Sequence, residues 1–164
     1  MSRHRILIVG ASGSGRSWLA RRIHDLTGIA VHDARPAGTS VPAAEHEWIV
    51  LAGQPEGLDR CLERADLVVL LCTPRWLRGL RIALAGLPMR ARHPGWRGAG
   101  AEWRASRGWD DAEGAAWAAR LGRRGGGADL VMKCGSSEDV RAVLERVFGI
   151  DASDDPAWPG RLAG

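Results

Sequence analysis

The residues in this sequence best suited to chemistry form one glycine-rich segment, Gly10-Ala11-Ser12-Gly13-Ser14-Gly15-Arg16-Ser17. The segment matches the phosphate-loop pattern GxxxxGK[ST] at every fixed position except the lysine. Its glycines let the backbone wrap closely around an anion, with several N–H groups turned toward it. A helix beginning here would add the positive end of its dipole. We therefore expect Gly10–Ser17 to hold the phosphates of a purine nucleoside triphosphate, and the Ser17 hydroxyl to ligate Mg²⁺.

Arg16 stands where the pattern has lysine. Lysine is a compact charge, whereas arginine is bulkier and favours a bidentate grip on phosphate. Phosphoryl transfer depends on the geometry and charge around the reacting group, so it tolerates such a change less well than binding does. The substitution is compatible with nucleotide binding and predicts weakened transfer.

Two other interpretations of the glycines are a plain glycine turn and a dinucleotide-binding GxGxxG turn. The order Gly10-x-x-Gly13-x-Gly15 does not fit GxGxxG. The acid that would be needed after the second strand is also unclear, because Asp33 lies in a loop-like stretch. A buried strand before the segment and an amphipathic helix after it favour the phosphate loop.

The elements that must position this loop alternate along the chain. Short apolar runs predict strands at residues 5–9, 29–31, 48–51, 67–72 and 129–132. Periodicity and end signals predict helices at residues 16–27, 56–65, 73–85, 110–121 and 136–148. This alternation predicts a three-layer α/β/α fold with a five-stranded parallel sheet, in which ligands bind at the carboxyl ends of the strands.

Several residues mark the expected helix ends. Gly28 is expected just beyond the first helix. Thr73 should cap a helix with Pro74 in its first position. Ser136 and Asp139 have the spacing of a capping box.

The chain has 164 residues, 45% of them apolar, which predicts one domain over about residues 1–150. Residues 87–108 set tryptophans and arginines among glycines and are expected to form an irregular, mobile, lid-like insertion, and residues 151–164 a flexible tail. The net charge is +4, with Lys133 as the single lysine. The three cysteines lack CxxC spacing, and no signal peptide or membrane span is apparent. We expect a cytoplasmic protein with reduced thiols and no membrane partner.

Arg5–Ser17 resembles the start of adenylate kinase-like P-loop proteins, and in particular the small group named DNA topology modulation proteins. Three further stretches agree in order: Gly28-Ile-Ala-Val, Glu47-Trp-Ile-Val, and Arg64–Leu77 with its Pro74-Arg75-Trp76. The resemblance spans roughly residues 3–148. It implies a nucleoside-monophosphate-kinase fold with ATP and Mg²⁺ at the phosphate loop.

The resemblance also implies an arginine-rich lid at about residues 89–107, where Arg90, Arg92 and Arg97 are candidates to contact phosphates. Asp33 matches the family's acid after the second strand and would orient the acceptor. The catalytic set that the resemblance implies is Arg16, Asp33, Arg90 and Arg92.

Two carboxylates usual in that family are missing from this sequence. The stretch Trp48–Gly53 has no acid where the family has an Asp-Gly pair. Cys72 stands near the place of the acid after the fourth strand. Metal-assisted transfer would therefore lose several contacts.

Three functions remain open from the sequence. The first is a P-loop kinase, a transferase that phosphorylates an unidentified small-molecule acceptor from ATP. The second is a catalytically impaired nucleotide-binding regulator. The third, a nucleic-acid-binding module, would use Trp96 and Trp103 among arginines to stack on bases, but a lid explains the same arginines.

Overall fold

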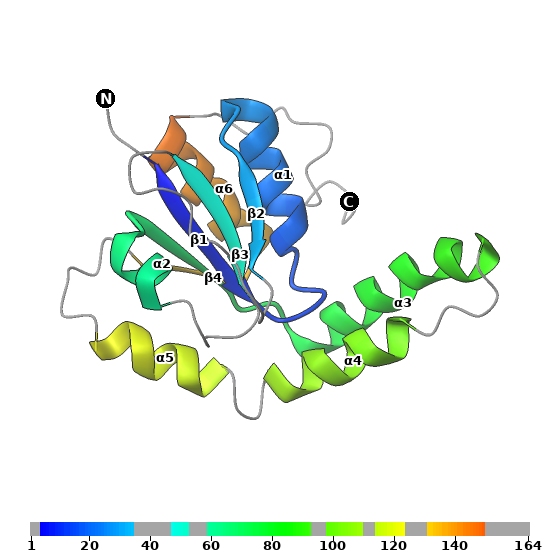
Figure 1. The fold of residues 1–164 in the computed structure, drawn as a ribbon. Coiled ribbons are helices and arrows are strands. Elements are labelled where there is room, and N and C mark those ends of the chain that lie inside the picture. The colour runs from blue at the N-terminus through cyan, green and yellow to red at the C-terminus, as the bar shows by residue number, and fades with distance from the viewer. Residues whose placement is uncertain are drawn as a thin grey trace.

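A computed structural model describes residues 4–34, 47–52, 59–92, 98–109, 114–123 and 131–149. One parallel sheet lies between two helical layers, and a helical hairpin projects from the end of the sheet at which the strands finish (Figure 1). The strands of this sheet are β1 (Arg5–Gly10), β2 (Val31–Ala34), β3 (Trp48–Ala52), β4 (Leu67–Leu71) and β5 (Val131–Cys134). Their order is β2-β3-β1-β4-β5. The predicted α/β fold with a five-stranded parallel sheet is confirmed.

The helices of the described ranges are α1 (Arg16–Thr27), α2 (Asp59–Arg64), α3 (Arg75–Arg92), α4 (Gly98–Gly108), α5 (Gly114–Arg123) and α6 (Ser137–Phe148). None of them is long and apolar enough to cross a membrane.

The strands alternate their side chains between two apolar cores. Ile6 and Ile8 of β1 pack with Leu19 and Ile23 of α1 and with Leu144 of α6. The neighbouring residues of the central strands face the opposite layer, in a second core that contains three buried tryptophans: Trp48 of β3, Trp109 and Trp117. Because β1 is buried on both faces, its continuous apolar run is what a central parallel strand requires. The phosphate-loop segment therefore leaves the middle of the sheet.

Two helix ends formed as the sequence predicts. Gly28 adopts a left-handed conformation, φ 76°, and its N–H donates to the His24 carbonyl at the end of α1. Ser136 caps α6 by accepting from the Asp139 N–H, while the Asp139 carboxylate accepts from the Ser136 N–H. The capping box that Asp139 completes is thus confirmed.

The start of α3 differs from the prediction. Its first helical hydrogen bond runs from the Arg78 N–H to the Pro74 carbonyl, so Pro74 is itself the cap residue. The Thr73 hydroxyl donates to the Ser14 carbonyl at 2.9 Å. Thr73 therefore fastens the end of β4 to the glycine-rich loop, a tertiary role that competes with capping.

The segment expected to be irregular is largely helical. α3 continues to Arg92, past the predicted end near residue 85, and α4 occupies residues 98–108. The two helices pack against each other, and the Trp103 ring lies where a Cβ on Gly79 would be. Arg78 joins them by hydrogen bonds to the Ser106 hydroxyl and carbonyl. This packing explains how a glycine-rich sequence forms two helices.

We expect the α6 capping box to make stability depend on pH. Hydrogen bonds from Ser136 and Gly135 lower the pKa of Asp139 in the folded state. Its contribution to folding is therefore present above the unfolded-state pKa and is lost as pH falls through the lower folded-state pKa. Asp139→Asn should reduce the acid-induced loss of stability, measured by urea denaturation at a series of pH values. Glu138→Gln, which leaves the capping bonds intact, is the control; equal pH profiles for both variants would refute the expectation.

Candidate nucleotide site

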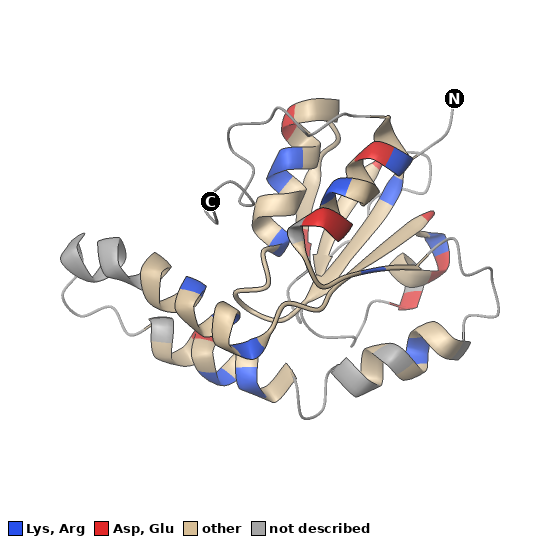
Figure 2. Cartoon of the chain, turned by 180° about the vertical axis from the view of Figure 1, so that it is seen from behind, with Lys and Arg blue, Asp and Glu red and all other residues tan. Residues whose placement is uncertain are grey.

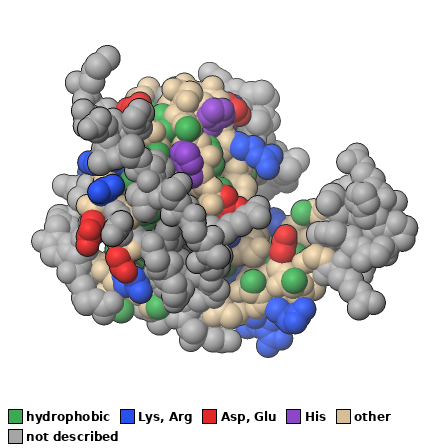
Figure 3. Space-filling model, viewed as in Figure 1, with side chains coloured by type: hydrophobic (Ala, Val, Ile, Leu, Met, Phe, Trp, Pro, Cys, Tyr) green, Lys and Arg blue, Asp and Glu red, His purple; other side chains and the backbone are tan. Residues whose placement is uncertain are grey.

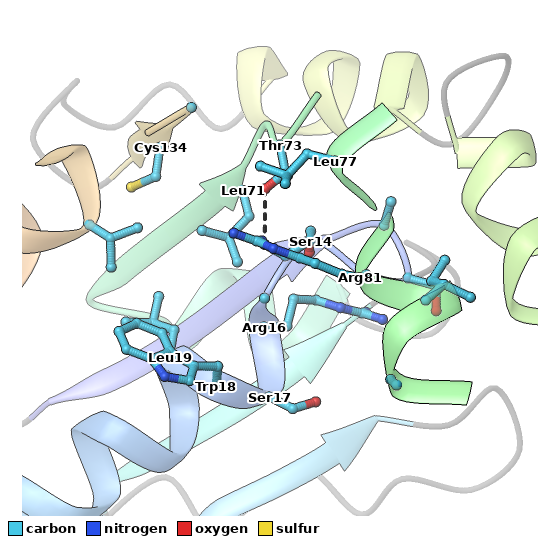
Figure 4. Close-up of a pocket in the computed structure, with 18 of the residues that line it drawn as sticks. Ser14, Arg16, Ser17, Trp18, Leu19, Leu71, Thr73, Leu77, Arg81 and Cys134 are labelled. Carbon is cyan, nitrogen blue, oxygen red and sulfur yellow. Dashed lines mark hydrogen bonds between the residues drawn. The ribbon is translucent and has the colours of Figure 1, made fainter. Parts of the chain in front are cut away.

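A cavity of about 860 Å³ opens beside the glycine-rich loop. Its walls come from residues 11–19, from α3 and α4, and from the turn between β5 and α6. Figure 4 shows side chains of these elements converging on the loop. Because strands β1, β4 and β5 all end here, the cavity lies at the carboxyl edge of the sheet, where the fold predicts a ligand.

The backbone of the loop depends on two glycines. Gly13 and Gly15 have φ angles of 78° and 101°, in the left-handed region that side chains disfavour. A Cβ on Gly13 would lie 2.7 Å from the Arg78 carbonyl oxygen of α3. Gly13 thus allows both the turn and the close approach of α3.

The N-terminus of α1 faces this turn without a side-chain cap. Gly15 is the cap residue and provides no side-chain acceptor for the first N–H groups of α1. The Ser14 hydroxyl is also buried, with the residue 4% exposed, and has no hydrogen-bond partner within the described ranges. Donors gathered without acceptors at a positive helix end suit an anion.

Arg81 is a site residue that sequence reasoning missed. Its Nη1 donates to the Ser14 carbonyl at 3.2 Å and would lie 3.4 Å from a Cβ on Gly15 (Figure 4). Leu77, four residues earlier on α3, also lines the cavity. Their i, i+4 spacing places the two residues on one face of α3, but the sequence alone does not show which face turns toward the loop.

The charged side chains that line the cavity are Arg16, Arg81 and Glu102. Viewed from behind, the molecule carries positive charges on both helices of the hairpin (Figure 2). In the space-filling view, basic side chains also gather along the lower edge of this hairpin (Figure 3). The cavity therefore has two guanidinium groups and one carboxylate among its described lining.

The structure brings some of the predicted site residues to the cavity but not all of them. All of the loop from Ala11 to Ser17 lines the cavity, and Gly10 ends β1 directly before it. Asp33 is exposed in the edge strand β2, not in a loop, with its Cα in register with Leu51; it does not line the cavity. The side chains of Arg90 and Arg92, and the whole of Arg97, lie outside the described part of the chain.

The thiols are unsuited to nucleophilic chemistry. Cys134 lines the cavity, and burial raises its pKa to about 12. Burial also raises the pKa of the more exposed Cys72. Both thiols are therefore protonated near neutral pH.

Few of the described side chains near the loop could ligate a magnesium ion. Ser17 offers an exposed hydroxyl, but the described residues contain no group of three side chains able to hold a metal ion. Neither β3 nor β4 ends in a carboxylate. Mg²⁺ is usually held by one or two carboxylates together with substrate phosphates. The residues at these strand ends therefore do not fit the expected metal site.

No protein-family model and no curated protein sequence matches this chain. Two solved structures resemble its fold, each with a TM-score of 0.50. One is an uncharacterized protein from Eubacterium ventriosum, 8% identical, covering 91% of this chain and 100% of that one. The other is shikimate kinase from Acinetobacter baumannii in complex with shikimate, 14% identical, covering 88% of this chain and 92% of that one.

These likenesses show the fold and nothing finer. The chain has a P-loop kinase-like fold, as the resemblance of Arg5–Ser17 implied. The particular likeness to DNA topology modulation proteins stays a prediction.

Proposed function

We propose that this protein binds a purine nucleoside triphosphate, ATP in the first instance, with the phosphates in the loop Gly10–Ser17. The supporting observation is the uncapped N-terminus of α1, preceded by two left-handed glycines and open to a cavity of about 860 Å³. A volume of this size is within the usual range for small-molecule sites.

Each part of the cavity has a role in this proposal. The loop N–H groups and the side chains of Arg16 and Arg81 bind the phosphates. Apolar side chains of α3 and α6, among them Ile82 and Val140, offer a surface for the base. Ser17 remains the predicted metal ligand, although the surrounding donors do not support a full metal site.

Phosphoryl transfer to a small-molecule acceptor is a second candidate, favoured by the P-loop kinase-like fold. Arg16 and the acid-free ends of β3 and β4 favour instead a binding protein with weak or no transferase activity. The roles of Asp33, Arg90 and Arg92 stay predictions. So does nucleic-acid binding, for which Trp103 is already engaged in packing against Gly79.

Calorimetric titration with ATP tests the proposal. The intact protein should release or absorb heat, and Gly15→Val should abolish the signal, because a β-branched side chain at φ 101° distorts the loop beside Arg81. Gly28→Val is the matched control: it imposes similar strain at φ 76°, with no atom within 4 Å of the added Cβ. It should still bind ATP. Absence of heat with the intact protein would refute the proposed function.

A further inference from the structure

We propose that the cavity binds the polyphosphate chain as a metal-free anion, with Arg16 and Arg81 neutralising the charge that Mg²⁺ neutralises in other P-loop proteins. The inference rests on the proposed function and specifies the form of its ligand. It assigns to two guanidinium groups a task that this fold usually leaves to a metal ion and a lysine.

The first support is the chemistry of the strand ends. β3 ends at Ala52 and is followed by Gly53, while β4 ends at Leu71 and is followed by Cys72. Within the described residues, neither strand end brings a carboxylate, the side chain that usually holds Mg²⁺, and the neutral thiol of Cys72 is a poor substitute. Asp33 is on the edge strand and outside the cavity lining.

The second support is the position of Arg81. Its guanidinium lies against the loop, 3.2 Å from the Ser14 carbonyl, and so borders the space where loop N–H groups would hold phosphate oxygens. Its neighbours Arg78 and Gly13 are fixed by packing between α3 and the loop. Arg81 therefore reaches the site from a rigid part of α3.

The third support is Arg16, the first residue of α1. Arg16 and Arg81 approach the loop from different elements (Figure 4). A guanidinium is always charged, is less strongly hydrated than an ammonium, and can donate two parallel hydrogen bonds to phosphate oxygens. Two such groups and the end of the α1 dipole can balance much of the charge of a triphosphate.

A magnesium ion would compete with these groups. It binds the same β- and γ-phosphate oxygens that the guanidinium forks use. The described strand ends bring no carboxylate to hold the ion, so among the described lining residues only the Ser17 hydroxyl and the Glu102 carboxylate of α4 are available to contact an ion on ATP. We therefore expect Mg²⁺ to leave ATP binding unchanged or to weaken it.

The decisive experiment is titration of the full chain with ATP in EDTA and again in excess MgCl₂ at matched ionic strength. A dissociation constant in EDTA equal to or lower than that in MgCl₂ supports the proposal. Tighter binding in MgCl₂, by more than about twofold, overturns it and leaves ATP binding itself intact. Absence of binding under both conditions refutes the proposed function together with this inference.

Variants identify the groups responsible. Arg16→Gln and Arg81→Gln should each weaken metal-free binding by about tenfold or more, as expected for lost charge-assisted hydrogen bonds. Arg104→Gln is the control, because Arg104 is exposed and bonds within α4 to the Gly100 carbonyl. Unchanged metal-free binding in both loop-facing variants, each shown folded by circular dichroism, would overturn the assignment.

A last variant in these titrations changes Glu102, the carboxylate among the described cavity-lining residues. Glu102→Gln should leave metal-free binding equal or tighter, because it removes a negative charge near the phosphates. If Glu102→Gln instead removed an enhancement of binding by Mg²⁺, Glu102 would be a metal ligand and the inference would be wrong.

Discussion

Gly13→Ala is expected to abolish ATP binding and to destabilise the fold by roughly 2–5 kcal/mol, the sum of backbone strain and steric overlap. The strain arises because alanine must adopt φ 78°. The overlap arises because its Cβ would lie 2.7 Å from the Arg78 carbonyl oxygen and 3.0 Å from Cγ1 of Ile82. A backbone carbonyl cannot move aside as a flexible side chain can, so α3 must shift away from the loop.

Gly28→Ala separates the two contributions. Gly28 has φ 76°, and no atom lies within 4 Å of an added Cβ, so this variant should lose only about 1–2 kcal/mol through strain. Urea denaturation of both variants gives the difference in the free energy of unfolding, and ATP titration shows whether Gly28→Ala still binds. Equal destabilisation of the two variants would mean that α3 does not press on the loop as the structure indicates.

Arg78→Met is expected to cost about 2–4 kcal/mol, because it leaves buried hydrogen-bond acceptors without donors. Arg78 is 3% exposed and donates to the Ser106 hydroxyl and carbonyl and to the Thr73 carbonyl. Methionine fills similar space but donates nothing. Losing these bonds should release α4 from α3, which hydrogen exchange would show as faster exchange of α4 amides.

The matched control for this variant is Arg75→Met. Arg75 is exposed on the same helix, and removing its charge should change the free energy of unfolding by less than about 0.5 kcal/mol. If Arg78→Met were equally mild, water would have to satisfy the acceptors at Ser106 and Thr73. The buried guanidinium would then contribute little to the hairpin.

Features that depend on neighbouring residues could be predicted from the sequence. The helix at residues 16–27 has the predicted bounds, because apolar spacing and Gly28 are local signals. The capping box of Ser136 and Asp139 is equally local. The alternation of strands and helices was enough for the fold class, since few arrangements bury such strands.

Features that depend on contacts between distant segments could not be predicted. Thr73 carries a helix-capping signal, yet its hydroxyl bonds to the loop, which is far away in the sequence. Nothing near Arg81 distinguishes it from other arginines until α3 is seen beside Ser14. The helical hairpin of α3 and α4 could not be predicted either, because it depends on the Trp103 ring packing against Gly79 from a distant part of the sequence. For Asp33, the short apolar run ended too early to reveal that β2 extends to Ala34.

The central place of β1 has a consequence for the order in which the protein folds. β1 precedes its partners β3 and β4 in the chain, and it pairs with them so that Arg5 lies beside Trp48 and Ile6 beside Leu67. Pairing across such intervals is slow, because loop closure must be completed before contacts form. The loop also needs Thr73 and α3, which emerge later still. The segment Arg5–Gly10 is therefore among the last to acquire its final surroundings, although it precedes its partners in the chain, and the proposed ATP ligand would stabilise only chains that have completed that step.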